Sequence, residues 1–542
     1  MKPKLILFCL VIVGLLLRVI FINNSPPSLY GDELTITLDA YSLLKTGQDQ
    51  LGNLLPLTFS MGAGRPAGYV YGSIPFVAIF GSSALGIRAL SILSGIGIII
   101  LLYYIGRKLF SGKVGIAAAF IGSVSPWDIS LSRGGFEAHF ALFLVLLGTY
   151  LFIQAKNTPV FYIISALSFG LTLHTYPTYK VSLLLFLPLL LWYQGDLKRV
   201  LNNYRKYFLT GVCIFIFFSG LSLIQTFTGG SEARFLGINI FAQDKLKDTI
   251  VQKINFERQI TQLPQSISKY FHNKPIEYAK VFSENYLQNF SIDFLILHGD
   301  RNPRHNMATM GEIYFIELVL IFIGFIASWY KEKRTKIFLF SWLFLAPIPA
   351  AIIDTPHALR SAFMFPPLVL FSAVGLITVF NHKNKLFSVL ILMIFIFQFI
   401  FFVQKLYFLA PKEYSNFWSY SAKLASQIAK NNKDKFTYVI LSDRIDNIEF
   451  AYPVYAKIDP NIIISQNQNK TLLNGSKFKK FDNIYIGYIP ESRVEKFIDS
   501  LERSMLYISS AGDKEFLSNP ELIDGLDGQK ALVLEKRALS NE

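Results

Sequence analysis

Charged side chains that could act together on a substrate occur in five groups along this sequence, each beside long apolar runs. The groups are Asp32, Glu33 and Arg65; Asp128, Arg133 and Glu137; His174 and Lys180; Asp300, Arg301, Arg304 and His305; and Asp354, His357 and Arg360. Arginine and lysine can hold a phosphate, and a carboxylate can remove a proton from an acceptor. A pocket that joins these groups would therefore suit a lipid-linked phosphate held beside a general base.

Other common site chemistries have no signature in the sequence. There is no Walker-type GxxxxGK[ST] motif and no GxGxxG between a predicted strand and a predicted helix. His and Cys do not occur at paired metal-ligand spacing, and Cys9 and Cys213 both lie inside apolar runs. We therefore expect no cofactor: carboxylates for a divalent metal are available, but no ligand set is recognisable.

The composition indicates which elements must position these residues. The 542 residues are 52% hydrophobic and 16% charged, whereas soluble domains carry about 25% charged residues. These values exclude a disordered chain, a collagen and a disulfide scaffold. They predict an all-α polytopic membrane domain with a smaller polar domain attached.

Eleven apolar stretches are candidates for membrane-spanning helices, which need about 20 mostly apolar residues. They cover approximately 5–22, 88–106, 114–124, 136–154, 160–173, 181–193, 207–227, 312–330, 336–353, 362–380 and 385–404. We expect the first to be an uncleaved anchor, because no small-residue cleavage site follows it. With the N-terminus in the cytoplasm, the inside segments carry sixteen Lys and Arg against two acids. This bias predicts a multi-pass cell-membrane protein, explains much of the net charge of +15 and sets nucleic acid aside.

Three longer segments then lie outside the membrane, at about 23–87, 228–311 and 405–542. The apolar segment Tyr69–Phe80 is short and contains Gly72 and Pro75, so we expect a re-entrant or interfacial helix. Apolar residues near helical spacing predict a short helix on the membrane surface over residues 34–45. A second amphipathic helix is predicted at 242–260.

The last outside segment predicts a small α/β domain. Residues 436–442, 483–489 and 531–535 are typical of strands, and 413–430 and 492–507 are typical of helices. We therefore divide the chain into a transmembrane domain, residues 1–405, and an extracytoplasmic C-terminal domain, residues 406–542.

Several motifs together resemble a known family. They are YGDE (Tyr30–Glu33), Arg65-Pro66, SPWDISLSRGGFEAHFALF (Ser125–Phe143), LHTYPTYK (Leu173–Lys180), GDRNPRH (Gly299–His305) and APIPA…TPHALRS (Ala346–Ser361). In combination they resemble the GT-C superfamily of glycosyltransferases, which includes the protein O-mannosyltransferases and the lipid A aminoarabinose transferase, and its bacterial RgtA/B/C/D-like members. The similarity covers about residues 1–405. The sequence departs from the family pattern at Arg65, where lysine is usual, and at Ala67, where a second proline is common.

The resemblance implies a hexosyl- or pentosyltransferase of the cell envelope. It would move a sugar from a polyprenyl-phosphate donor to a lipid, glycan or protein acceptor on the outer membrane face, with Asp32 as general base. Charge stabilisation should dominate, because polyprenyl phosphate is already a reasonable leaving group, and a single base opposite it implies inversion. Substrate contacts are expected from Glu33, Arg65, Arg133, Glu137, His174, Arg301, His305, His357 and Arg360.

Structural roles for these residues compete with the functional ones. Asp32 could cap a helix that starts at Leu34, and Arg65 could extend to lipid headgroups. Arg133 and Glu137, four residues apart, favour an intrahelical ion pair. His174 could be a hydrogen-bonded interfacial histidine, and His357 and Arg360 could anchor to headgroups. The remaining group could be a solvated turn, formed by Asp300, Arg301, Arg304 and His305.

Two further function classes are alternatives: a transporter or flippase of lipid-linked sugars, and a scaffold that presents the C-terminal domain. Transporters often have internal repeats and polar breaks at the midplane, whereas the polar residues here gather at one face. An enzyme requires Asp32, Arg65, His357 and Arg360 to meet in one cavity, and a scaffold would leave them scattered. His357 and Arg360, three residues apart, would share one helix face.

Overall fold

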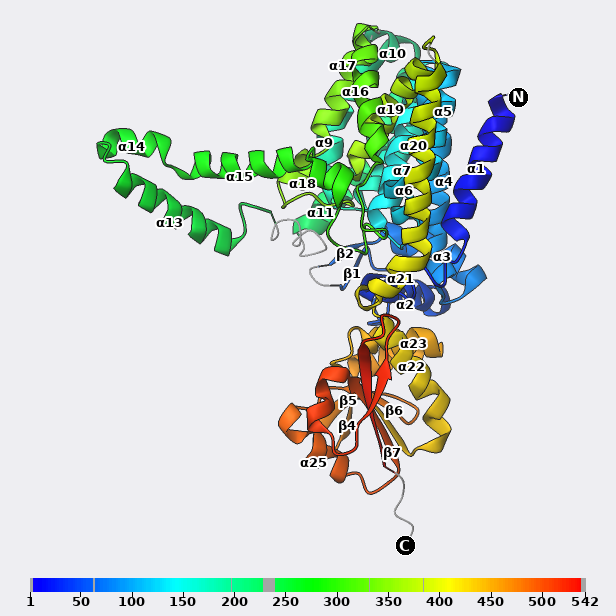
Figure 1. Cartoon of the computed structure of the whole chain (residues 1–542), viewed down its shortest axis with the longest axis vertical. Coiled ribbons are helices and arrows are strands. Elements are labelled where there is room, and N and C mark those ends of the chain that lie inside the picture. The colour runs from blue at the N-terminus through cyan, green and yellow to red at the C-terminus, as the bar shows by residue number, and fades with distance from the viewer. Residues whose placement is uncertain are drawn as a thin grey trace.

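The computed structural model describes residues 3–61, 64–195, 197–227, 239–330, 332–383 and 385–537. A long helical bundle carries a C-terminal α/β domain at one end, and the N-terminus lies toward the other end (Figure 1). The outside segment predicted to start at residue 228 is thus described only from residue 239 onward.

Every predicted span contains a helix of the bundle. These helices are α1 (Pro3–Val19), α4 (Ala84–Leu109), α5 (Gly112–Val124), α7 (Glu137–Gln154), α8 (Phe161–Leu173), α9 (Thr178–Gln194), α11 (Arg205–Phe227), α16 (Phe315–Trp329), α17 (Lys333–Leu345), α19 (Phe365–Phe380) and α20 (Lys385–Gln404). Between them lie the short helices α6 (Pro126–Ser132), α10 (Leu197–Asn203), η1 (Asp293–Leu297), α18 (Ile348–Ala351) and η2 (Ala362–Met364). Three more short helices lead from α20 to the C-terminal domain: η3 (Lys405–Leu409), α21 (Ala410–Glu413) and η4 (Ser415–Trp418).

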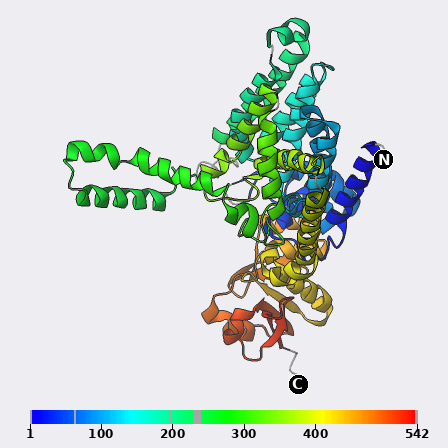
Figure 2. The ribbon, with the colours of Figure 1, turned by 45° about the horizontal axis from the view of Figure 1, so that its top comes forward.

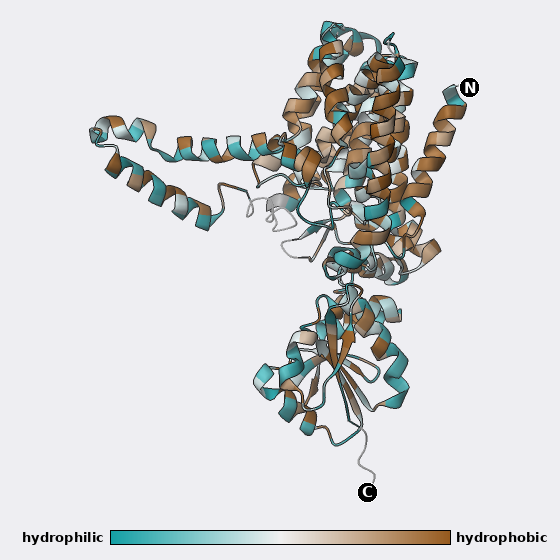
Figure 3. Cartoon of the chain, in the orientation of Figure 1, coloured by the Kyte–Doolittle hydropathy of each residue, from teal (hydrophilic) through white to brown (hydrophobic). Residues whose placement is uncertain are grey.

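The bundle is apolar over most of its length (Figure 3), as a multi-pass membrane protein requires. Among the described residues, five helices are long and apolar enough to cross a membrane alone: Ala84–Leu109, Glu137–Gln154, Arg205–Gln225, Ala362–Phe380 and Lys385–Glu413. α5 and α6 would form a sixth membrane-spanning segment if they are one span, bent by 56° at the break between them. Several of the other bundle helices are shorter than 18 residues, so their length alone does not show that they cross a membrane. The structure therefore does not confirm the predicted number of eleven spans.

The C-terminal domain is built on a seven-stranded sheet. The strands lie in the order β4 (Thr471–Leu473), β5 (Ser476–Phe481), β6 (Ile484–Gly487), β3 (Tyr438–Ser442), β7 (Met505–Ser510), β9 (Lys530–Arg537) and β8 (Glu521–Asp524). β3 is parallel to both β6 and β7, and the other neighbouring pairs are antiparallel. One face packs against α22 (Tyr420–Asn432), α23 (Ile448–Ala456) and α24 (Pro460–Gln468), and the other against α25 (Val494–Asp499).

The strands predicted at 436–442, 483–489 and 531–535 are present as β3, β6 and β9. The helix predicted at 492–507 is wrong in its second half, because α25 ends at Asp499 and β7 begins at Met505. Alternate residues of β7 pack against opposite faces of the sheet, so the strand is buried on both sides. Such a strand lacks the polar alternation that separates strands from helices in a sequence.

Helix α2 (Gly31–Thr46) lies where the bundle meets the C-terminal domain. It packs against α3 (Gly68–Phe80) on the bundle side and against α23 and α24 on the other side. Leu34, Ile36 and Leu38 are almost fully buried. The prediction of a helix on the membrane surface is therefore wrong, because protein covers the apolar face of α2. Two short strands, β1 (Thr58–Phe59) and β2 (Arg65–Pro66), pair between α2 and α3.

A helical arm extends sideways from the bundle (Figure 2). It consists of α13 (Asp244–Ile260), α14 (Gln265–Phe271) and α15 (Lys274–Gln288). The predicted helix at 242–260 corresponds to α13, in which Ile250 and Ile254 are buried and most other residues are exposed.

Candidate active site

Asp32 lies in the first turn of α2. The helix begins at Gly31 with Tyr30 in the N-cap position, and no side chain caps it. The alternative in which Asp32 caps a helix from Leu34 is therefore wrong. The positive end of the helix dipole favours a carboxylate in this turn. The Asp32 side chain is 39% exposed, so it is accessible to a substrate.

Arg65 connects Asp32 to a second carboxylate. Its Nη2 lies 2.7 Å from Asp32 Oδ1, and its Nε lies 2.9 Å from Glu137 Oε1. Burial lowers the pKa of Arg65, but Glu137 and Asp32 raise it by more, so the pKa lies above its ordinary value. The Arg65 side chain is only 4% exposed and belongs to this ion-pair network rather than to the lipid headgroups.

Asp300, His305 and His357 form a second polar cluster. Asp300 Oδ2 lies 3.1 Å from His305 Nδ1 and 3.6 Å from His357 Nδ1, and the two imidazole centroids are 4.4 Å apart. The potential ligand atoms of all three residues lie within 4.8 Å of one another, so this donor set could hold a divalent cation. The pKa of His357 lies well below its ordinary value because the ring is buried beside His305, and this favours the neutral, metal-binding form. The ligands come from two loops without motif spacing, so the sequence does not reveal them.

One cavity of about 310 Å³ unites most of these groups. It is lined by Tyr30, Asp32, Gly64, Arg65, Pro66, Glu137, Tyr176, Pro177, Thr178, Asn302, Arg304, His305, Ile353, His357, Leu359 and Arg360. Six predicted site residues therefore meet there: Asp32, Arg65, Glu137, His305, His357 and Arg360. This convergence is what the enzyme hypothesis requires, and it contradicts the scattered arrangement expected of a scaffold.

His357 and Arg360 reach the cavity from a turn rather than from a helix face. Residues 352–361 contain no regular helix, and η2 starts only at Ala362. The backbone N–H of Ala358 donates to Asp300 Oδ2 at 2.8 Å and holds this turn in place. The prediction of a shared helix face is therefore wrong, although both side chains line the cavity.

Arg304 lines the cavity although it was not among the predicted substrate contacts. Its guanidinium lies 5.3 Å from the ring centroid of Tyr30, and its Nε donates to the carbonyl oxygen of Phe417 at 2.5 Å. The polar turn that contains it, next to His305, is the signal that could have identified it. Arg304 and Arg360 thus add two guanidinium groups to the cavity besides the ion-paired Arg65, and a guanidinium group can bind phosphate bidentately.

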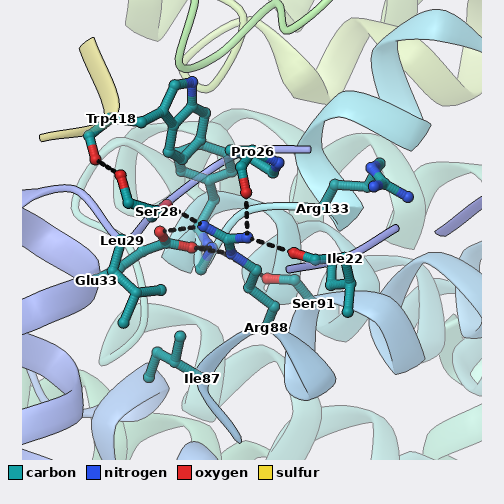
Figure 4. Close-up of polar contacts among 12 residues, drawn as sticks. Ile22, Pro26, Ser28, Leu29, Glu33, Ile87, Arg88, Ser91, Arg133 and Trp418 are labelled. Atoms are coloured by element: carbon teal, nitrogen blue, oxygen red, sulfur yellow. Dashed lines mark hydrogen bonds and ion pairs between the residues drawn. The ribbon is translucent and has the colours of Figure 1, made fainter. Parts of the chain in front are cut away.

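Glu33, the neighbour of Asp32, does not face the cavity. It is fully buried and paired with Arg88, with Nε–Oε1 and Nη2–Oε2 distances of 2.7 and 2.8 Å (Figure 4). Glu33 Oε1 also accepts a hydrogen bond from the backbone N–H of Gly135 at 2.9 Å. Arg88 donates further to the carbonyl oxygens of Ile22 and Ser28. The predicted substrate contact of Glu33 is therefore replaced by a structural ion pair. The sequence did not indicate this pair, because Arg88 is the first residue of the predicted span 88–106 and stands outside the five polar groups.

Arg133 is also structural. It is fully buried, its Nε and Nη1 donate to the carbonyl oxygens of Ser25 and Leu17, and its guanidinium lies 4.9 Å from the Tyr407 ring centroid. The predicted intrahelical pair with Glu137 is wrong, since Arg133 ends α6 and Glu137 starts α7 and binds Arg65.

Two further predicted contacts lie outside the cavity. His174 ends α8, and its Nε2 lies 3.0 Å from the carbonyl oxygen of Phe218. Arg301 is 88% exposed, and its guanidinium lies 3.7 Å from Asp293. The interpretation of these two as a hydrogen-bonded histidine and a solvated arginine fits the structure better than substrate contact.

A second, apolar cavity of about 580 Å³ lies between α8, α9 and α11. Phe169, Leu183 and Phe215 contribute to its lining, and Lys180 is the one charged residue among the described residues that line it. Residues 176–178, which precede and begin α9, line the polar cavity, so both cavities border the same segment. A polar cavity beside an apolar groove suits an amphiphile with an anionic head and a long apolar chain.

Comparisons with known proteins agree with this architecture. Residues 69–223 match the family model described as dolichyl-phosphate-mannose-protein mannosyltransferase. The structure of ArnT from Cupriavidus metallidurans bound to undecaprenyl phosphate matches with a TM-score of 0.54 and 11% identity, covering 99% of both chains. The apo structure of the same protein matches with a TM-score of 0.53 and 11% identity, covering 97% of both chains. No curated protein sequence matches the chain.

A more distant similarity links the chain to the oligosaccharyltransferase from Archaeoglobus fulgidus in complex with zinc and sulfate. It has a TM-score of 0.48 and 14% identity and covers 83% of this chain and 61% of that one. The ArnT comparison shows that the fold is shared over the whole length of the chain, and the mannosyltransferase family model matches part of the bundle. The chain is therefore similar in fold to ArnT over its whole length and, over residues 69–223, similar in sequence to the dolichyl-phosphate-mannose-protein mannosyltransferase family.

Proposed function

We propose that this protein transfers a sugar from a polyprenyl-phosphate donor to an acceptor at the outer face of the membrane. The observation that carries the proposal is the single cavity in which Asp32 and Glu137 lie with Arg65, Arg304 and Arg360. The apolar groove beside it has the character that a polyprenyl chain needs. The binding of undecaprenyl phosphate by ArnT, which shares the fold, supports the same donor class.

In this mechanism Arg304 and Arg360 hold the donor phosphate and stabilise the charge that develops as it leaves. Asp32 removes the proton of the acceptor group as that group attacks the anomeric carbon from the side opposite the phosphate. This in-line displacement inverts the anomeric configuration. Arg65 positions Asp32 through their 2.7 Å contact, and Glu137 holds the other side of the same guanidinium.

The proposal includes an orientation in the membrane. The excess of Lys and Arg in the predicted inside segments places the N-terminus in the cytoplasm. The candidate active site and the C-terminal domain then face the exterior. The location of the N-terminus and the C-terminal domain toward opposite ends of the bundle supports this orientation (Figure 1).

The Asp32→Asn variant tests the mechanism. Transfer should fall by about 100- to 10,000-fold, as expected for loss of a general base, while donor binding changes little. The assay uses purified protein in lipid vesicles with a panel of polyprenyl-phosphate sugars and follows donor consumption. Asp354→Asn, an exposed carboxylate that does not line the cavity, is the matched control.

Two results would contradict the proposal. Normal turnover by Asp32→Asn would remove this residue from the mechanism. A wild-type protein that consumes none of the donors would reject the transferase function itself and favour transport of a lipid-linked sugar.

A further inference from the structure

The C-terminal domain contains a cavity of about 500 Å³ at the carboxyl ends of two parallel strands. β3 and β6 are neighbours, and the residues that follow them, Asp443 and Tyr488, both line this cavity. The chain after β3 continues through α23 and α24 on one face of the sheet, whereas the chain after β6 continues through α25 on the other face. Connections that diverge in this way open a crevice between the strand ends, which is where open α/β sheets bind ligands.

The charged residues of this crevice favour an anion. Three lysines, Lys470, Lys477 and Lys479, and two carboxylates, Asp443 and Glu449, line it, which leaves a net charge of +1. Lys479 Nζ lies 2.7 Å from Glu449 Oε2, so these two charges compensate each other. Among the described residues, neither Lys470 nor Lys477 lies within ion-pair distance of a carboxylate, although Lys470 interacts electrostatically with Asp443 at longer range, and both side chains are exposed to a phosphate or carboxylate.

Other groups in the crevice suit the body of a sugar. The Tyr488 side chain is 56% exposed and offers an aromatic surface for the C–H face of a pyranose. Asp443 presents an exposed carboxylate, which can accept hydrogen bonds from hydroxyl groups. An anionic sugar would therefore use both the lysines and these groups, whereas a free anion would use the lysines alone.

Asn447 joins the crevice to the candidate active site. A Cβ atom added to Gly31 would lie only 2.6 Å from Asn447 Oδ1, so the start of α2 touches the crevice wall. Asp32 is the next residue of α2 and lines the polar cavity. The crevice and the polar cavity therefore border the same first turn of α2.

We propose that this crevice binds an anionic sugar unit of the acceptor, with Lys470 and Lys477 holding its phosphate or carboxylate. The inference rests on the proposed glycosyl transfer and assigns the acceptor to the acidic saccharides. It also gives the C-terminal domain a role, because the domain supplies a second substrate site beside the membrane-embedded donor site.

Binding to the purified full-length protein in detergent tests this assignment. Calorimetric titrations use glucose 6-phosphate and glucuronic acid as probes, with glucose and inorganic phosphate as reference ligands. At least one acidic sugar should bind saturably and more tightly than both references. Substitution of both lysines, Lys470→Ala with Lys477→Ala, should raise the Kd about tenfold or more, because each lysine contributes a charge-assisted contact. Lys496→Ala, an exposed lysine on the opposite face of the sheet, should leave the Kd unchanged.

The outcomes separate this inference from the proposed reaction. Absence of saturable binding, equal affinity in the double variant, or inorganic phosphate binding as tightly as the acidic sugars would overturn the crevice assignment. Asp32→Asn should bind the acidic sugar like the wild type. If acidic sugars bind as expected while the wild type consumes no donor, the proposed reaction fails and the binding site stands.

Discussion

Two regions at the same end of the bundle contain the same kinds of residues and use them differently. In the polar cavity, Asp32 is 39% exposed and shares Arg65 with Glu137. In the interior beside it, Glu33 and Arg88 are fully buried, and their charged atoms are bonded to each other and to backbone groups (Figure 4). The comparison teaches that a charged residue near the membrane indicates function only when it keeps an atom accessible to a ligand.

A second buried cluster, formed by Arg18, Asp128 and His139, also contains charged residues that no ligand can reach. Asp128 accepts a hydrogen bond from Arg18, and its other oxygen lies 2.8 Å from His139 Nε2. All three side chains are fully buried between α1, α6 and α7. They connect helices and thereby hold the wall from which Glu137 reaches the cavity.

The largest expected effect comes from breaking the buried pair. Arg88→Ala leaves the Glu33 carboxylate buried without its cation and should destabilise the protein by roughly 3–5 kcal/mol. Thermal unfolding of the detergent-solubilised protein should therefore occur at a much lower temperature. The double variant Glu33→Gln with Arg88→Met should recover part of this loss, because no uncompensated charge remains. Unfolding of Arg88→Ala at the wild-type temperature would contradict a structural role for the pair.

A smaller effect should distinguish Arg360, which lines the polar cavity, from Arg301, which lies outside it. Arg360→Ala removes a guanidinium from the cavity and should raise the donor KM about ten- to hundredfold, as expected for a lost charge-assisted hydrogen bond. Arg301→Ala, which changes an 88% exposed side chain outside the cavity, should alter KM by less than twofold. Steady-state kinetics with the donor that the panel identifies would measure both. Equal effects of the two substitutions would contradict the assignment of Arg360 to the donor phosphate.

A pH-dependent effect on stability concerns Asp39, a third carboxylate of α2. Burial raises its pKa to about 7, although the backbone and side-chain amides of Gln50 donate hydrogen bonds to Oδ1. Between about pH 4 and pH 7 the folded protein therefore keeps the Asp39 carboxyl group protonated, whereas the unfolded protein, with a pKa of about 3.9, has released this proton. The free energy of unfolding should therefore decrease as the pH rises through this range. Asp39→Asn should remove this dependence, with a melting temperature equal to the wild type at pH 4 and a few degrees higher at pH 8. Parallel melting curves across that range would show that Asp39 does not titrate in this way.

Much of the candidate site could be predicted from the sequence. The bias of Lys and Arg among the loops predicts which loops lie on the same side of the membrane. The five polar groups all fall in or next to loops predicted on one side, so they can approach one another. Asp32, Arg65, His357 and Arg360 therefore could be expected to meet, and they do. Glu33 and Arg133 could not be separated from them, because residue type and proximity to a span do not reveal which way a side chain points.

The sequence by itself determined that this chain forms a membrane bundle with an α/β domain, and it indicated which polar residues gather at one end. These properties follow from local composition and hydrophobic period, which depend on neighbouring residues. Only the tertiary structure decided that Asp32 faces the cavity and Glu33 the interior. Successive residues of a helix point about 100° apart, so their surroundings depend on how distant segments pack around α2. The burial of β7 and the crevice beside Lys477 likewise arise from contacts between segments that are distant in the sequence.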